Sequence, residues 1–258
     1  MKNLYDLNKR LLVSLVLVVI VFLLITYSQN PIMKVVITFL FALICATALW
    51  EYANLSFAKE INVSKKTMIA FGVLQIFGVY FTAMPLVLLI AAGVGLFLVH
   101  FKRPTDALSN VATAFFGICY IAIPLSFMLD ILYTDGRWWL VYLLLVTKIT
   151  DIGAYFVGRL WGKHRLAPVL SPKKTVEGGI AGLVCAIGLS VAMGGPHAIL
   201  LGAAMGIFGQ IGDLAESLFK RDADFKDSNK LPGLGGILDM IDSLLFTAPI
   251  LYCYLRIL

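Results

Sequence analysis

The sequence is poor in charged residues, and this shortage excludes most soluble classes of protein. Only 14% of its 258 residues are charged, while 60% are hydrophobic, and the mean hydropathy is +0.91. Soluble domains carry about 25% charged and about 45–50% apolar residues. The composition therefore excludes a soluble globular domain and a disordered chain, and it predicts a protein with several membrane-spanning segments.

The sequence also lacks cysteine pairs and soluble basic modules. Its four cysteines lie far apart inside apolar runs, and no Cys-x-x-Cys pair occurs. This spacing excludes a disulfide scaffold and argues against thiolate metal sites, so we expect buried thiols. The net charge of +6 is typical of loop lysines and arginines in a membrane protein. We expect no nucleic-acid partner.

Long apolar runs make up most of the chain. A bilayer core about 30 Å thick needs about 20 apolar residues in a helix. Continuous runs without regular alternation favour helices over a β-barrel. The sequence therefore predicts an all-α polytopic membrane protein with about nine transmembrane helices, in which the separation of the third and fourth is least marked. The runs lie at about 11–28, 35–53, 67–83, 85–100, 107–129, 138–158, 176–193, 197–216 and 237–257.

The lysines and arginines predict the orientation of these helices. With a cytoplasmic N-terminus, 17 of the 21 basic residues fall in inside segments, three fall outside, and Lys148 falls within a span. Cytoplasmic loops carry the excess of basic residues in membrane proteins. We expect a multi-pass protein of the cell (inner) membrane, with about five helices in residues 1–140 and a second transmembrane domain in 141–258, where any chemistry would be placed. Its two long loops, 159–175 and 217–236, would face the cytoplasm.

The scarce charge is concentrated in two stretches of the C-terminal half. Residues 148–177 and 213–242 hold 19 of the 36 charged residues. The first stretch is net basic and the second is net acidic. Basic groups suit phosphates and carboxylates suit a hard divalent cation. Phosphoryl or nucleotidyl transfer needs both.

Several of these charges fall in or beside apolar helices, where ionisable groups are costly unless they are paired or face a cavity. Lys148 and Asp151 share one helix face, which fits either a structural ion pair or a role of Asp151 in a site. Asp213 follows a face of glycines at 202, 206 and 209, which is typical of a helix-packing seam. The seam explains the glycines but not Asp213.

Two turns in these stretches resemble phosphate-binding turns. A Pro-Gly-rich turn ends at Gly235 and Gly236, just before Asp239 and Asp242, which are three residues apart at a helix start. Such a turn could bind phosphate, and such aspartates could share a metal, although a plain turn and helix capping would explain each alone. The second turn is 171–179, which combines two lysines and a hydroxyl with a helix start. Its lysines could also be topology signals.

The order of these residues resembles the signature of phosphatidate cytidylyltransferases, the CDP-diacylglycerol synthases. The similarity covers roughly the last 110 residues, and the family is also helical and multi-spanning. Its upstream block resembles Asp151, Ala154-Tyr155, Gly158-Arg159, Gly162-Lys163 and Ser171-Pro172-Lys173-Lys174-Thr175-Val176-Glu177-Gly178. Its downstream block resembles Ser217-Leu218-Phe219-Lys220-Arg221, Lys226-Asp227, Pro232-Gly233-Leu234-Gly235-Gly236-Ile237-Leu238-Asp239 and Ile241-Asp242-Ser243.

The resemblance implies transfer of cytidylate from CTP to phosphatidic acid, at the cytoplasmic face and within phospholipid biosynthesis. It implies Mg²⁺, with room for a second cation, and it is compatible with a homodimer. The implied metal ligands are Asp213, Asp239 and Asp242, and the implied catalytic residues are Lys220, Arg221, Lys226 and Asp227. The implied substrate-binding residues are Asp151, Lys173, Lys174, Thr175, Glu177, Ser217, Gly235 and Gly236.

Three departures from the family pattern accompany this resemblance. Leu234 and Met240 stand where the family usually has histidine and arginine, and the segment before Pro232 is one residue shorter. Two other functions stay open. A CTP-dependent polyprenol or lipid-alcohol kinase would use similar groups, and a cation-coupled transporter would also place charges in spans. The position of the polar clusters at one membrane face argues for an enzyme.

Overall fold

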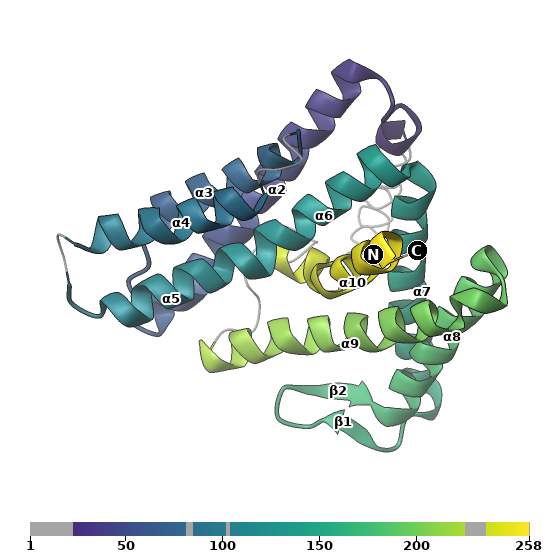
Figure 1. The fold of residues 1–258 in the computed structure, drawn as a ribbon. Helices are drawn as coiled ribbons and strands as arrows, with labels where there is room; N and C mark the ends of the chain where they lie inside the picture. Colours follow the sequence, from purple (N-terminus) through teal and green to yellow (C-terminus); the bar gives the residue numbers. More distant parts are fainter. Residues whose placement is uncertain (1–22, 81–84, 102–103, 225–235, 258) are drawn as a thin grey trace, which may run out of the picture.

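The computed structural model describes residues 23–80, 85–101, 104–224 and 236–257, and these residues are helical almost throughout (Figure 1). The α-helices are α2 (Pro31–Ala58), α3 (Lys65–Phe77), α4 (Pro85–His100), α5 (Ala107–Gly117), α6 (Ile123–Asp130), α7 (Arg137–Trp161), α8 (Val176–Gly194), α9 (Ile199–Asp222) and α10 (Ile237–Ile257). Short 3₁₀ turns are η1 (Gly78–Tyr80) and η4 (Pro196–Ala198), and π-helical turns are η2 (Ile118–Ala122) and η3 (Ile131–Asp135).

Six helical stretches of the described residues are long and apolar enough to cross a membrane. They are Pro31–Ala58, Ala107–Asp135, Arg137–Trp161, Val176–Gly194, Pro196–Asp222 and Ile237–Ile257. These confirm an all-α, multi-pass membrane protein, but not the predicted nine spans. Helices α3 and α4 have only 13 and 16 residues, which is short for a bilayer core of about 30 Å. Most of the first predicted span lies outside the described residues.

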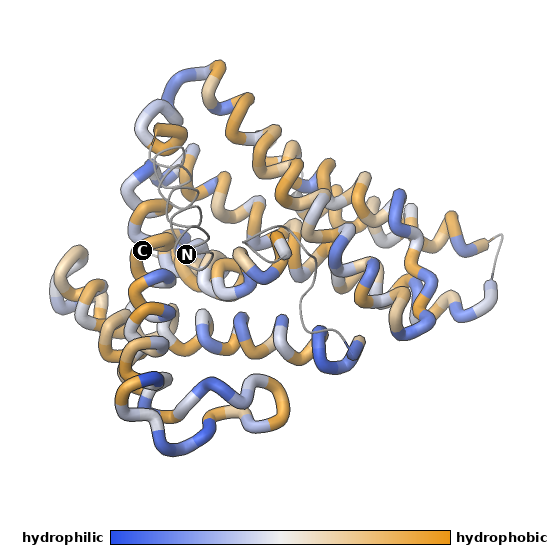
Figure 2. Tube along the Cα trace, turned by 180° about the vertical axis from the view of Figure 1, so that it is seen from behind, coloured by the Kyte–Doolittle hydropathy of each residue, from blue (hydrophilic) through white to orange (hydrophobic). Residues whose placement is uncertain are grey.

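The helices form two groups that meet at α10. Helices α2 to α6 lie roughly along one another, whereas α7, α8 and α9 pack together on one side of this group (Figure 1). Helix α10 packs on α9, α7, α6 and α2, so it contacts both groups. Most residues along the helices are hydrophobic, and hydrophilic residues are frequent on the β-hairpin, at the C-terminal end of α9 and at the ends of other helices (Figure 2).

The segment predicted as a loop at 159–175 is largely ordered secondary structure. Helix α7 continues to Trp161, and an antiparallel hairpin follows, formed by β1 (Arg165–Ala167) and β2 (Ser171–Thr175). Helix α8 begins directly after it. The Thr175 hydroxyl accepts a hydrogen bond from the Gly178 amide, and the Val176 amide donates to the His164 carbonyl. Two amides at the start of α8 are therefore already bonded within the chain.

The second predicted loop, 217–236, also begins in a helix. Helix α9 runs to Asp222, so Ser217, Lys220 and Arg221 are helical residues rather than loop residues. Its apolar run ends near residue 216, but its charged last turns stay helical because they pack against neighbouring elements. The boundary drawn from hydropathy was therefore wrong by about two turns.

Helix α9 approaches α10 closely at Gly212. A Cβ atom at this position would lie 2.6 Å from the carbonyl oxygen of Asp242, closer than real Cβ atoms come. Only glycine allows this approach without a shift of backbone. The sequence thus brings the charged end of α9 against the first turns of α10.

Candidate active site

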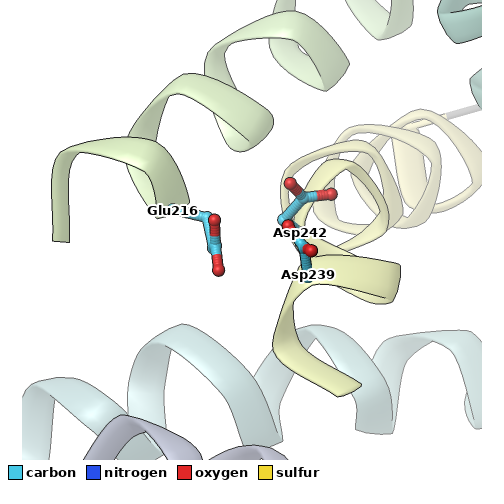
Figure 3. A group of neighbouring side chains, drawn as sticks. All are labelled: Glu216, Asp239 and Asp242. Atoms are coloured by element: carbon cyan, nitrogen blue, oxygen red, sulfur yellow. The ribbon is translucent and has the colours of Figure 1, made fainter. Parts of the chain in front are cut away.

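Three carboxylates from two helices converge where α9 meets α10. Glu216 lies on α9, and Asp239 and Asp242 lie on α10, with one oxygen of each within 4.8 Å of the others. Figure 3 shows Glu216 facing the two aspartates across the gap between the helices. Glu216 and Asp242 are buried, whereas Asp239 is exposed. The arrangement offers three hard oxygen ligands, the kind that Mg²⁺ and Ca²⁺ prefer.

Lys220 partly neutralises this carboxylate cluster. Its Nζ atom lies 2.7 Å from Glu216 and 2.6 Å from Asp239, and its side chain is buried. Three carboxylates and one ammonium leave a formal charge of −2. The Oε1 atom of Glu216 is the oxygen that pairs with this ammonium. The charge and the oxygen spacing of the cluster both fit a divalent cation.

Glu51 of α2 fixes the start of α10, close to the carboxylate cluster. Its carboxylate accepts hydrogen bonds from the amides of Ile237 (3.0 Å) and Leu238 (2.9 Å), and its side chain is buried. A negative charge at a helix start also stabilises the helix dipole. This helix start was expected to favour a phosphate anion, and in the structure two of its amides are bonded to Glu51.

A basic cavity lies next to the carboxylate cluster. It has a volume of about 690 Å³ and is formed by the ends of α7 and α8, the hairpin and α9. The cationic side chains that line it are Arg159, Lys163, Arg165, Lys173 and Lys174, and the acidic ones are Asp151 and Asp213. Thr175, Tyr155 and Gln210 add polar groups to its wall. Such a cavity suits a polyphosphate.

Asp213 connects the cavity with the carboxylate cluster. It pairs with Lys174 at 2.6 Å and lies one helical turn before Glu216 on α9. Its charge also acts on Glu216 and Asp242. Asp213 thus lines the cavity and lies one helical turn from the cluster. The predicted metal role of Asp213 stays a prediction, because its carboxylate is paired with a lysine here.

Other predicted residues lie around the cavity in different ways. The Glu177 carboxylate accepts hydrogen bonds from the amides of Lys163 and His164 and pairs with the His164 ring at 2.6 Å, so it orders the turn before the hairpin. Asp151 pairs with Lys148 at 3.4 Å. Arg221 donates from Nε to the carbonyl of Leu170 at the hairpin tip. Each would support the cavity from one side.

Some predicted residues cannot be placed. Lys226, Asp227 and Gly235 lie outside the described residues, as does Leu234. Gly236 is described and buried, and it directly precedes α10. Ser217 is half-buried on α9, next to Glu216.

The sequence interpretation missed two carboxylates at this site. Glu216 belongs to the polar face of α9, but Asp213 was preferred on that face because it lies deeper in the apolar run. Glu51 is a lone acidic residue in an apolar helix. The only signal for Glu51 in the sequence was the free-energy cost of placing an ionisable side chain in a membrane-spanning helix.

The fold and the site define a class: a multi-pass membrane protein with an acidic cluster and a basic cavity suited to phosphate chemistry. The comparisons with known proteins give the family. The profile of the cytidylyltransferase family matches residues 8–258, so the chain belongs to this family.

The chain is similar to phosphatidate cytidylyltransferases from three bacteria. The Chlamydia pneumoniae protein is 34% identical over 98% of this chain and 92% of its own, and the Chlamydia muridarum protein is 40% identical over 61% and 58%. The Staphylococcus haemolyticus protein is 46% identical over 46% and 49%.

Proposed function

We propose that this protein transfers cytidylate from CTP to phosphatidic acid and so produces CDP-diacylglycerol and pyrophosphate. The observation that carries the proposal is the match of almost the whole chain to the cytidylyltransferase family. It is also supported by a basic cavity and an acidic cluster that Asp213 and Glu216 bring within one turn of α9, because CTP and the lipid phosphate both need charge neutralisation. The reaction belongs to phospholipid biosynthesis.

The chemistry needs positioning more than it needs a base. An oxygen of the lipid phosphate forms a bond to the α-phosphorus of CTP, and the bond from that phosphorus to the β-phosphate oxygen breaks. The attacking phosphate is already anionic. Catalysis then rests on alignment and on neutralising the charge of the transferring group. The cavity lysines and arginines would hold the β- and γ-phosphates, which leave as pyrophosphate.

The carboxylate cluster would hold the cation that this reaction requires. Glu216, Asp239 and Asp242 fit Mg²⁺ by charge and spacing, and Asp213 is a further candidate ligand, for this cation or for a second one. When bound, Mg²⁺ would neutralise charge on the transferring phosphate. Lys220 lies at the same cluster, where it could contact a substrate phosphate. Arg221, Lys226 and Asp227 complete the proposed catalytic residues.

The location in the membrane is also part of the proposal. The excess of basic residues in alternate loops supports an active site on the cytoplasmic face of the inner membrane. CTP would enter the cavity from the cytoplasm. The lipid phosphate would reach the cluster from the membrane, with its acyl chains against the apolar helices.

The direct test is a product assay with the purified full chain. With labelled CTP, Mg²⁺ and phosphatidic acid in detergent micelles, we expect label in the lipid fraction and one pyrophosphate for each lipid formed. A lipid-alcohol kinase would instead release CDP and leave the label in the aqueous phase. Failure to label lipid with any divalent cation would refute the proposed function.

Lys174 provides a test of the cavity as the CTP site. We expect Lys174→Met to raise the KM for CTP about tenfold or more, because a charged hydrogen bond contributes about 1.5–3 kcal/mol. The turnover number should change much less. Steady-state kinetics at varied CTP would measure both. Lys66→Met is the control, because Lys66 is exposed on α3 and does not line the cavity. An unchanged KM in Lys174→Met would contradict this assignment.

A further inference from the structure

Tyr120 has a buried hydroxyl group to which no described residue forms a hydrogen bond. The residue is only 9% exposed, and its Oη atom has no hydrogen bond among the described residues. The neighbouring Tyr52 differs, because its hydroxyl donates to the carbonyl of Thr113 at 3.2 Å. A buried hydroxyl without a partner destabilises a protein, so its presence calls for an explanation.

Aromatic contacts place Tyr120 at the carboxylate cluster. Its ring packs against Phe219 of α9, with centroids 5.6 Å apart, and against Phe246 of α10, with centroids 6.1 Å apart. Phe219 lies three residues after Glu216, and Phe246 lies four residues after Asp242. Residues at these spacings share one face of a helix. Tyr120 therefore faces the same seam as the two buried carboxylates.

The electrostatics agree with this position. The charges of Asp242 and Glu216 both act on the Tyr120 hydroxyl. Glu216 Oε1 already pairs with Lys220 Nζ at 2.7 Å, whereas Tyr120 Oη has no hydrogen bond in the described part of the chain. A ligand bound at the cluster would satisfy this hydroxyl.

The backbone at Tyr120 is also unusual. The residue lies in the π-helical turn η2, between α5 and α6. Such turns inside helices are rare and are frequent at functional sites. The extra residue in the turn changes the direction in which the following side chains point. It therefore provides a physical means of aiming Tyr120 at the seam.

We propose that Tyr120 is a further catalytic residue, whose hydroxyl donates a hydrogen bond to a substrate phosphate oxygen held at the carboxylate cluster. This inference rests on the proposed function. The donor would stabilise negative charge that increases on the phosphate during transfer. The N-terminal half of the chain would then supply a group to the reaction itself.

Tyr120→Phe tests this role because it removes only the hydroxyl. We expect the turnover number to fall about ten- to a hundredfold, with thermal stability unchanged or higher, since an unsatisfied buried group is lost. Binding of Mn²⁺ without substrate, followed by electron paramagnetic resonance, should be unchanged. A normal turnover number would overturn the proposal, and so would an activity loss matched by lower stability or weaker Mn²⁺ binding.

Tyr142→Phe is the matched control. Tyr142 is also buried, but its hydroxyl bonds to Ser190 at 2.8 Å and lies between α7 and α8. We expect this variant to lose stability and to keep its turnover number, the reverse of Tyr120→Phe. If Tyr120→Phe stays active while Asp239→Asn is inactive, the Tyr120 proposal fails and the proposed function stands.

Discussion

Asp239→Asn is expected to lower turnover by about a thousandfold or more while the protein stays folded. Asp239 offers the most exposed oxygens of the carboxylate cluster and bonds to Lys220, so it lies where a cation and a substrate phosphate would meet. Its replacement by a neutral amide removes one negative charge from a site whose formal charge is −2. Loss of a cation's charge stabilisation costs several kcal/mol in the transition state. The assay is lipid labelling at saturating CTP and Mg²⁺.

A second measurement separates lost chemistry from lost folding. Mg²⁺ that binds only the folded protein should raise its thermal midpoint, and this rise should be absent in Asp239→Asn. Asp222→Asn is the control, because Asp222 is exposed at the end of α9, where it pairs with Lys59, and it is not part of the carboxylate cluster. Near-normal turnover in Asp239→Asn would contradict the metal assignment.

The same assay shows whether Glu216 or Asp213 is the third metal ligand beside Asp239 and Asp242. If Glu216 completes the cluster, Glu216→Gln should resemble Asp239→Asn. Asp213→Asn should then chiefly weaken CTP binding, because Asp213 pairs with Lys174 in the cavity. The opposite ranking would support the ligand set that the sequence alone predicted.

Asp239 and Asp242 could be singled out from the sequence for a local reason. Their spacing of three residues puts both on one helix face, and no packing information is needed to see this. Part of the basic charge of the cavity was also predictable from local sequence, since Lys173 and Lys174 are adjacent in the chain. Residues that are close in sequence stay close in the folded protein, so such patterns need no knowledge of the packing.

Glu51 and Tyr120 could not be found in this way. Glu51 contacts amides 186 and 187 positions later in the chain, and Tyr120 reaches the site through rings on α9 and α10. Such contacts depend on how the helices pack, which hydropathy does not encode. The N-terminal half was therefore expected to supply spans alone.

The element boundaries show a similar limit. The hydropathy pattern placed the end of helix α9 near residue 216, because charged residues lower the mean hydropathy of the segment. The helix continues to Asp222 because its last charged turns bond to other parts of the chain, as Arg221 does to the hairpin. The hairpin itself was missed, since its strands of three and five residues are too short for a clear alternation.

Glu51→Ala is expected to lower turnover about a hundredfold and to reduce stability. Its carboxylate is the acceptor for one buried and one partly buried amide at the start of α10, and a buried amide left unsatisfied costs about 1–3 kcal/mol. Asp239 lies one residue beyond these amides, so a looser first turn would displace it from Glu216 and Lys220. A displacement of about 1 Å can cost about a hundredfold in rate. Turnover should be measured well below the thermal midpoint of the variant.

Graded substitutions would show that Glu51 controls the position of the α10 carboxylates and does not act through folding alone. Glu51→Gln keeps one carbonyl acceptor for an amide, so it should recover part of the turnover and lower the Mg²⁺ concentration needed for half-maximal rate relative to Glu51→Ala. Glu60→Gln is the control, because Glu60 is exposed in the loop after α2. A folded Glu51→Ala protein with full turnover and normal Mg²⁺ dependence would mean that α10 holds its carboxylates without help from α2. If the Mg²⁺ concentration needed for half-maximal rate instead falls from the alanine variant to the glutamine variant to the wild type, then Glu51 on α2 positions the carboxylates of α10.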